Sequence, residues 1–401
     1  MEKTVCELFA GVGGFRLGLE NASKEWKTVW FSQWEPGAKK QWAHDCYVKH
    51  WGDIDNNTGI DIGLVDKNNI PDHNLLVGGF PCQDYSVARP LPGATGIEGK
   101  KGVLWWQIVE TLEKKQTPFV LLENVDRLLK SPAKQRGRDF GVMLACLDKL
   151  GYSVEWRVIN AADYGAAQRR RRTFIFAYKN TTEFAKRYLN KNPIYTINLT
   201  GFFAKTFPIE PVKQEELSTW SFDSDDIFAI SENFKFNFEN AGFMSQGAII
   251  TAKTTPKFEE PTPLKKIVQK NVPEEFYLGS DLEKWEYMKG AKKILRTSKT
   301  GYQYNFAEGP IAFPDSIDKP ARTMLTSEAT KNRSTHVIKD PQTKKLRLIT
   351  PLEAERIQGF EDEWTNTGMP KSMRYFCMGN ALVVPMVTRM GKTLNEIFKN
   401  E

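Results

Sequence analysis

Short apolar runs alternate with helix-like segments through the first half of this 401-residue chain. The apolar runs read as buried strands that end at polar or glycine-rich turns, and segments with helical spacing follow several of them. Such alternation is typical of an α/β fold with a mostly parallel sheet. The predicted strands are 4–9, 28–34, 75–78, 118–125, 153–160 and 173–178, and the predicted helices are 15–21, 37–51, 103–115 and 142–150.

The regular pattern stops near residue 180. From about residue 190 to about 340 the chain is rich in Lys, Thr, Ser, Asn, Phe and Pro, without a strong helical period. Helical patterns return at 350–359 and 381–398. We therefore predict a first domain at 1–185, a separate loop-rich, partly β domain at 186–340, and a return to the first domain at 341–401.

Composition narrows the class of protein. The net charge of +7 favours a polyanionic partner, although a generic basic protein has the same balance. No apolar stretch reaches the roughly 18 residues of a membrane span, and the N-terminus lacks a signal-peptide pattern. The five cysteines are odd in number and widely spaced, which argues against disulfides and structural zinc. We expect a reducing, intracellular compartment, no membrane and no metal.

A glycine-rich turn follows the first predicted strand. The order strand, glycine turn, helix suits a nucleotide-type cofactor, because glycine lets the backbone approach a ligand and a helix N-terminus offers free N–H groups. The match to G-x-G-x-x-G is incomplete, so a plain turn remains the alternative, and the turn lacks the Gly-Lys-Ser/Thr of a P-loop. The residues of the turn are Phe9, Ala10, Gly11, Val12, Gly13 and Gly14.

Two further residues could contact such a cofactor. Trp34 ends the second predicted strand and could stack on an adenine ring, or it could be a core aromatic. Asp53 could accept the adenine amino proton, or it could be a solvated loop residue.

Cys82 is the candidate nucleophile. It follows Pro81 in the stretch VGGFPCQDYS, directly after a predicted strand, and ligand crevices of α/β sheets lie at that edge. A thiolate there could react, whereas most cysteines are small buried residues. Residues 83–102 form a long loop with Gly and Pro, a length typical of functional lids.

Charged residues follow or precede two other predicted strands. Glu123 ends a buried run and should lie at the same sheet edge, unless it only forms a salt bridge. Four successive arginines, 169–172, precede the last strand, so two of them should face a cleft, unless the run is a solvated turn. Asn380 precedes an apolar helix and reads alone as an N-cap.

Taken in order, these segments resemble the DNA cytosine-5 methyltransferases. ELFAGVGGFRLGLE is similar to the cofactor loop of that family, GGFPCQDYS to its Pro-Cys segment and LLENV to its Glu-Asn-Val segment. AQRRRR carries its Gln-x-Arg-x-Arg pattern, and RLITPLEAERIQGF and MGNALVVP are similar to its closing motifs. The resemblance implies a Rossmann-like S-adenosylmethionine-dependent methyltransferase sheet at 1–185 and 341–401, with 186–340 as a smaller target recognition domain.

The resemblance also implies the chemistry. Cys82 would attack carbon 6 of a cytosine that is flipped out of the duplex. Glu123 would hydrogen-bond or protonate ring nitrogen 3, Arg172 would hold the base carbonyl, and Arg170 would support the site or a phosphate. The implied substrate contacts are Gln83, Ser86, Asn124 and Gln168.

The implied cofactor is S-adenosyl-L-methionine. The family usually has an acid immediately before the tryptophan, where this chain has Gln33; its amide can still bond a ribose, unless Glu35 turns in. The implied cofactor contacts are Phe9, Ala10, Gly11, Gly13, Gly14, Gln33, Trp34, Asp53, Ile54, Pro81, Leu104, Asn380 and Ala381.

The resulting hypothesis is a sequence-specific double-stranded DNA methyltransferase of restriction-modification type. We expect a monomer in a prokaryotic cytoplasm or nucleoid, with a cognate restriction endonuclease as a candidate partner. Two alternatives are a tRNA cytosine-5 methyltransferase, although the Cys-Phe-Thr tripeptide of that branch is missing, and a catalytically dead DNA-binding relative. Candidate base-reading residues are Arg322, Thr326, Ser327, Lys331, Asn332 and Arg333.

Overall fold

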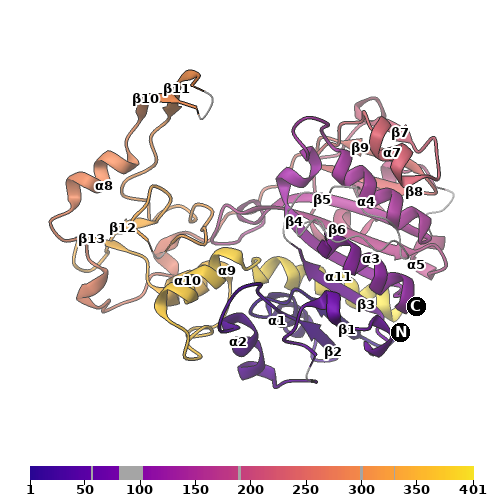
Figure 1. The fold of residues 1–401 in the computed structure, drawn as a ribbon, viewed down its shortest axis with the longest axis horizontal. Helices are drawn as coiled ribbons and strands as arrows, with labels where there is room; N and C mark the ends of the chain where they lie inside the picture. The colour runs from indigo at the N-terminus through magenta and orange to yellow at the C-terminus, as the bar shows by residue number, and fades with distance from the viewer. Residues whose placement is uncertain (56, 81–102, 188–190, 299–300, 329) are drawn as a thin grey trace. The chain divides into compact units, whose positions relative to one another are not determined.

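The structure is a computed structural model that describes residues 1–55, 57–80, 103–187, 191–298, 301–328 and 330–401. These residues form two compact units, which are described separately (Figure 1). In the described part of the chain, no helix is long and apolar enough to cross a membrane. Unit 1 comprises Met1–Tyr164, Arg171–Glu259 and Val384–Glu401, and unit 2 comprises Gly165–Arg170 and Glu260–Val383.

Among the described residues of unit 1, nine strands form one sheet in the order β2-β1-β3-β4-β6-β5-β8-β9-β7. The pairs β1–β2, β1–β3 and β3–β4 are parallel, and the other neighbouring pairs are antiparallel. The prediction of a mostly parallel sheet is therefore wrong, because β6 runs back along β4 and hairpin-type pairing extends the sheet from there. The strands are β1 Thr4–Leu8, β2 Lys27–Ser32, β3 Leu75–Gly79, β4 Phe119–Val125, β5 Tyr152–Asn160, β6 Arg171–Lys179, β7 Ser218–Ser221, β8 Ala241–Ser245 and β9 Ala248–Ala252.

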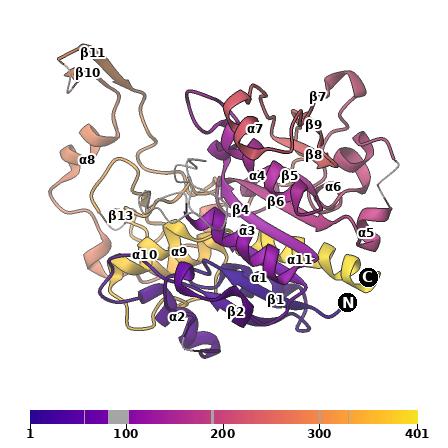
Figure 2. The same cartoon turned by 45° about the vertical axis from the view of Figure 1, so that its right-hand side comes forward.

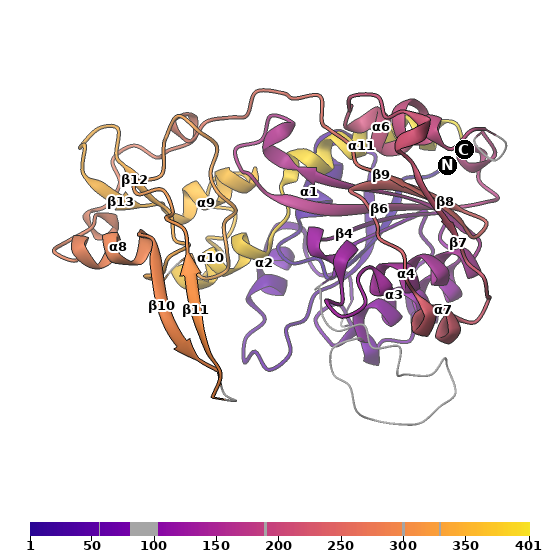
Figure 3. The ribbon, with the colours of Figure 1, turned by 90° about the horizontal axis from the view of Figure 1, so that it is seen from above.

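Helices cover both faces of the sheet (Figures 2 and 3). On one face, α3, α4 and α7 share a core with Leu76, Val120 and Trp156 of the strands. On the other face lie α1, α6 and α11, where Phe398 packs against Phe119 with ring centroids 5.1 Å apart. The helices of unit 1 are α1 Gly14–Ala22, α2 Trp42–Trp51, α3 Val103–Lys115, α4 Arg138–Lys149, α5 Glu183–Lys186, α6 Phe202–Thr206, α7 Ile227–Asn233 and α11 Val384–Lys399.

Unit 2 contains little regular structure. Much of its interior is ionic: the buried guanidinium of Arg347 lies 2.7 Å from carboxylate oxygens of both Asp340 and Glu353. These contacts connect the short antiparallel sheet that contains Arg347 to the helix that contains Glu353. Its elements are α8 Leu282–Lys289, α9 Pro351–Gln358, α10 Lys371–Asn380, β10 Lys292–Thr297, β11 Gln303–Glu308, β12 Val337–Lys339 and β13 Leu346–Leu348.

The six strands predicted in the first half are confirmed to within two residues, but three other predictions need correction. The compact units do not follow the predicted boundaries: 186–259 lies in unit 1, because β8 pairs with β5 and β9 with β8. The predicted helix 37–51 begins only at Trp42. Helix α10 was not predicted, and Asn380 is its last residue rather than the N-cap of α11, which begins at Val384.

Candidate active site

The carboxylate and guanidinium of Glu123 and Arg172 form the centre of the candidate site. Antiparallel pairing places Val125 opposite Arg172, so Glu123 and Arg172 lie close together on neighbouring strands. Arg172 Nε lies 2.8 Å from Glu123 Oε1, and the two side chains are 18% and 12% exposed. A pair with this partial exposure remains accessible to a ligand. The sheet therefore brings these two predicted residues together.

Asn124 fixes the neighbouring strand end. Its buried side chain donates from Nδ2 to the Phe80 carbonyl oxygen at 2.9 Å and accepts at Oδ1 from the Val125 N–H at 2.8 Å. Register also pairs Gly79 of β3 with Glu123. Asn124 thus holds the main chain immediately before the Pro-Cys segment, and the substrate contact predicted for it stays a prediction.

Four predicted residues cannot be placed. Pro81, Cys82, Gln83 and Ser86 lie outside the described residues. The other cysteines are Cys6, Cys46, Cys146 and Cys377, all buried. Burial raises the pKa of the Cys146 thiol to about 12 and that of Cys6 further, so neither thiol is a ready nucleophile.

The glycine turn adopts the backbone that its sequence predicts. Phe9, Gly11 and Gly13 have φ values of 55°, 58° and 85°, and helix α1 begins at Gly14. A side chain at Gly13 would come within 2.2 Å of the Trp51 ring, whereas the space beside Gly11 is open to 4 Å. The Ala10 N–H donates to the Ser32 carbonyl at 2.9 Å, which ties the turn to the end of β2. The turn is compact on one side and open on the other.

Gln33 supports this turn directly. Its buried side chain accepts at Oε1 from the Gly11 N–H at 2.7 Å. Among the described residues its Nε2 donates to no protein acceptor, so that group can donate to a ligand. Beside it, the Trp34 ring is 39% exposed. Burial raises the pKa of Glu35, whose carboxylate therefore favours its protonated form more than a solvated one does.

Asp53 is anchored rather than free. Its Oδ1 accepts from the Thr58 hydroxyl at 2.6 Å and from the Ile54 N–H at 2.9 Å. His44 Nε2 lies 3.0 Å from the same hydroxyl. Thr58 and His44 were not predicted, because no motif links a loop threonine to a helix histidine fourteen residues earlier. Leu104 is partly buried against the core of α3 and the sheet.

Gln168 and Arg170 belong to unit 2 and are buried there. Gln168 Oε1 accepts from the Met324 N–H at 3.0 Å, and Arg170 donates to the carbonyls of Met324 and Gly379 at 3.1 and 2.9 Å. The catalytic role predicted for Arg170 and the substrate contact predicted for Gln168 stay predictions beside these contacts with the main chain. Both residues instead fix the backbone around Met324. As the sequence predicted, the arginines alternate: Arg170 and Arg172 are shielded, whereas the other two are exposed.

Asn380 and Ala381 lie at the C-terminal end of α10 in unit 2, with Asn380 exposed. The buried Gln358 was not predicted, yet its Nε2 donates to the carbonyls of Met378 and Ala381 at 2.5 and 3.2 Å. It therefore holds the main chain on both sides of Asn380. The only sequence signal was its place in the RIQGF motif.

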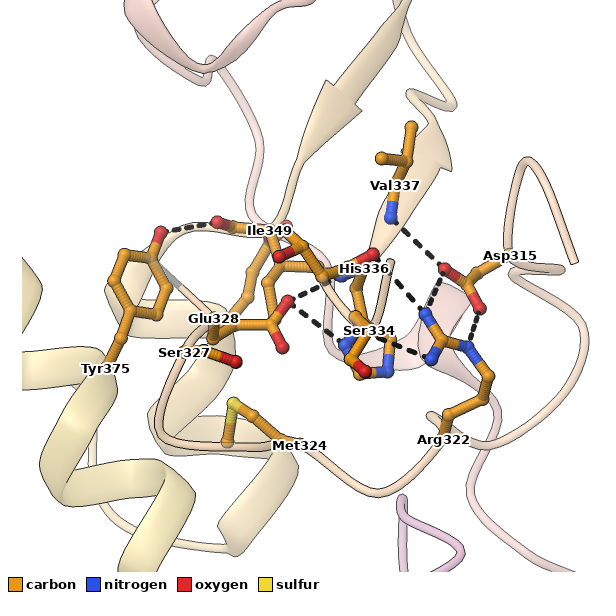
Figure 4. Close-up of polar contacts among 12 residues, drawn as sticks. Asp315, Arg322, Met324, Ser327, Glu328, Ser334, His336, Val337, Ile349 and Tyr375 are labelled. Atoms are coloured by element: carbon orange, nitrogen blue, oxygen red, sulfur yellow. Dashed lines mark hydrogen bonds and ion pairs between the residues drawn. The ribbon is translucent and has the colours of Figure 1, made fainter. Parts of the chain in front are cut away.

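The guanidinium of Arg322, a candidate base reader, is hydrogen-bonded to other residues of unit 2 (Figure 4). Its Nε donates to Asp315 Oδ1 at 2.6 Å, and its Nη1 donates to the Ser334 carbonyl at 3.1 Å. Arg333 likewise donates to the carbonyls of Met288 and Gly290, both at 2.9 Å. Neither guanidinium is free to read a base in this arrangement.

A cavity of about 350 Å³ in unit 1 lies elsewhere. It opens beside the end of β5, and no predicted site residue lines it. Its walls mix acidic and basic groups, so its charge favours neither an anion nor a cation. The charged lining residues are Asp126, Lys130, Arg157, Asp163, Arg171, Glu239 and Lys253.

The chain is similar in sequence to known DNA methyltransferases. The chain is 51% identical to the type II methyltransferase M.Sau3AI of Staphylococcus aureus over 399 residues, covering 98% of this chain and 95% of that protein. It is 25% identical to M.SsoII of Shigella sonnei, covering 97% and 79% of the two chains.

Two solved structures share the fold. The S. pombe Dnmt2 methyltransferase matches with a TM-score of 0.58 at 16% identity, and a putative E. coli prophage DNA modification methyltransferase matches with 0.53, also at 16%; each comparison covers 99% of both chains. The family model for C-5 cytosine-specific DNA methylases spans residues 3–396. With the paired carboxylate and guanidinium and the open glycine turn, this match shows that the chain is a DNA cytosine-5 methyltransferase of restriction-modification type, a member of the C-5 cytosine-specific DNA methylase family.

Proposed function

We propose that the chain transfers a methyl group from S-adenosylmethionine to carbon 5 of a cytosine flipped out of a specific duplex DNA sequence, through a transient bond to Cys82. The ion pair of Glu123 and Arg172 is the observation that supports this most. It joins a proton donor or acceptor and a fixed cation, the two groups that a polarised pyrimidine ring needs. Register places Glu123 beside the end of β3, from which the chain continues into the Pro-Cys segment.

The glycine turn fits the cofactor. The open space beside Gly11 suits a close approach of the ligand to the backbone. The N–H groups at the start of α1 suit an anionic group, and the exposed ring of Trp34 suits an adenine. When bound, S-adenosylmethionine supplies the methyl group. Gln33 keeps the turn in shape through Gly11 and can donate from its amide to a ribose hydroxyl.

The chemistry follows from the weakness of carbon 5 as a nucleophile. The Cys82 thiolate adds to carbon 6, and the electron pair of the 5,6 double bond moves to carbon 5. Glu123 hydrogen-bonds or protonates ring nitrogen 3 while Arg172 holds the carbonyl oxygen, so both stabilise the developing charge. After carbon 5 is methylated, its proton leaves to water, the double bond re-forms and the thiolate departs.

Target recognition is assigned to residues 260–340 of unit 2 rather than to all of 186–340. Residues 186–259 carry strands of the central sheet and are needed for that fold. Similarity to bacterial type II methyltransferases supports a prokaryotic cytoplasmic enzyme. We also propose that it acts as a monomer, with a cognate restriction endonuclease as candidate partner.

The test is methyl transfer by the full-length chain from labelled S-adenosylmethionine to duplex DNA of varied sequence. We expect 5-methylcytosine within one sequence motif, and a covalent adduct on duplexes that contain 5-fluorocytosine. Cys82→Ala should abolish both and keep DNA binding, whereas the exposed control Glu396→Gln should change neither. Transfer to tRNA instead of DNA would establish the tRNA alternative, and DNA binding without an adduct would establish a dead core.

A further inference from the structure

The hairpin of β10 and β11 stands apart from the rest of unit 2. Six consecutive residue pairs, from Lys292 with Glu308 to Thr297 with Gln303, join the two strands. Within the described residues, neither strand pairs with any other strand. Figures 1 and 3 show the hairpin extending away from β12, β13 and α8 of the same unit. It is a two-stranded ribbon with both faces open.

A ribbon of this kind is marginally stable alone in water. Most of its side chains are exposed, including large apolar ones: Leu295 is 61% and Tyr302 is 71% exposed. Ile294 and Tyr304 are also exposed. Apolar groups gathered on a projecting element mark a contact surface. The ribbon therefore has the exposure expected of an element that another molecule covers.

The charge of the ribbon selects a polyanion. Strand β10 carries Lys292, Lys293 and Arg296 and no acid. The one acid of β11, Glu308, lies 3.7 Å from Arg333 of the same unit and is balanced there. The Arg296 guanidinium lies 3.6 Å from the centre of the Phe306 ring, so the cation is held on a rigid aromatic support.

The register divides the side chains between two faces. Arg296, opposite Tyr304, shares one face with Ile294 and Phe306. The other face carries the polar and aliphatic residues Lys293, Leu295, Thr297, Gln303 and Asn305. The side-chain amides of Gln303 and Asn305 are exposed and make no hydrogen bond within the described residues. This second face presents donors and acceptors in a row beside Lys293, whereas Lys292 and Arg296 lie on the first face.

We propose that the β10–β11 ribbon lies in the major groove of the substrate duplex, where Gln303 and Asn305 read adenine bases. The major groove admits a two-stranded ribbon, and glutamine and asparagine can each make two hydrogen bonds to the edge of an adenine. Lys293 and Arg296 contact phosphates, which adds affinity without sequence preference. The inference rests on the proposed DNA methyltransferase activity and names the residues that choose its target.

The test uses the full-length chain, labelled S-adenosylmethionine and a pool of duplex oligonucleotides with a randomised central segment, read by bisulfite sequencing. Gln303→Ala and Asn305→Ala should each weaken the preference at one A·T position of the motif by about 5- to 150-fold. Gln303→Glu keeps the length of the side chain but loses the hydrogen-bond donor, so this variant should also lose its preference for adenine. Asn237→Ala, an exposed amide of unit 1, is the control and should leave the motif unchanged.

The phosphate contacts have a separate readout. Lys293→Ala and Arg296→Ala should weaken binding to all sequences alike and lower the slope of log K against log salt by about 0.9 each. Lys339→Ala, an exposed strand lysine of unit 2, should not lower it. An unchanged motif in all three amide variants would overturn the inference, even if the salt slope fell. A wild-type chain that methylates no duplex would instead overturn the proposed function.

Discussion

Close carboxylate–guanidinium pairs occur in both units, in different surroundings. Glu123 and Arg172 of unit 1 project from long strands whose main chains are hydrogen-bonded to each other along seven residue pairs, and both side chains keep some exposure. Arg347 of unit 2 is fully buried between Asp340 and Glu353, beside strands of only three residues.

The difference shows whether the main chain positions the ion pair or the ion pair positions the main chain. In unit 1 the sheet determines where the charges lie, so the ion pair is not needed to hold the main chain. In unit 2 the ion pair determines where the main chain lies, because too little hydrogen-bonded strand exists to do so. Similar pairs should therefore respond to substitution in opposite ways.

Glu123→Gln should give the largest effect, and on the reaction alone. Loss of a proton donor or acceptor at the base should lower the methyl transfer rate by about 10²- to 10⁴-fold. The unfolding free energy should change by less than about 1 kcal/mol, since the strands remain paired. Single-turnover transfer and urea unfolding measure the two quantities, with Glu396→Gln as control. A large loss of stability at a retained rate would show that this pair is structural, like that of Arg347.

Arg347→Ala should have the reverse effect. Removal of the cation leaves two buried carboxylates without their partner, which should cost about 3–5 kcal/mol. Hydrogen exchange in β12 and β13 should accelerate accordingly. The control is Lys265→Ala, whose exposed pair with Asp318 should contribute under about 1 kcal/mol. Equal effects of the two variants would contradict the structural role of Arg347.

The same contrast explains what the sequence could predict. Short apolar runs predicted the six strands of the first half, and the end of β4 and the start of β6 bring Glu123 and Arg172 together. The hairpin of β8 and β9 carried a signal that was missed: Gln246-Gly247, both at positive φ, between two apolar runs.

The contacts of unit 2 could not be predicted from apolar runs in the sequence. A paired, partly buried arginine such as Arg322 and an exposed one look alike in sequence, since only the fold supplies Asp315 as a partner. The contacts of Arg170 could not be predicted for the same reason: the carbonyls to which it donates come from residues more than 150 positions away. Where buried charged residues do not recur with a helix or strand period, the sequence shows no pattern that predicts their burial.

Glu7 offers an intermediate case, a buried carboxylate of unit 1 on which burial outweighs the nearby cation of Arg16. Burial raises its pKa from 4.5 to about 7, although the Tyr47 hydroxyl donates to it at 3.0 Å. Below pH 4.5 both the folded and the unfolded chain hold this proton. Between 4.5 and about 7 only the folded chain holds it, so the unfolding free energy falls by about 1.4 kcal/mol per pH unit. Above about 7 the loss is complete.

Glu7→Gln should remove that dependence. The stability of the variant relative to the wild type should therefore rise across this window by up to about 3 kcal/mol. Urea unfolding at a series of pH values measures the difference. Glu396→Gln, on the surface, should give a profile parallel to that of the wild type. A parallel profile for Glu7→Gln would mean that the carboxylate is already ionised in the folded chain.

The smallest effect is expected at Gln33, which connects the sheet to the glycine turn. Gln33→Ala removes the acceptor of the Gly11 N–H, and one hydrogen bond of about 1 kcal/mol corresponds to roughly five- to tenfold weaker binding of S-adenosylmethionine. Gln33→Glu keeps the acceptor and should bind more tightly than Gln33→Ala. Calorimetric titration with the cofactor separates the two variants. If both bind as the wild type does, the turn keeps its shape without this contact, and the backbone of unit 1 alone positions the cofactor loop.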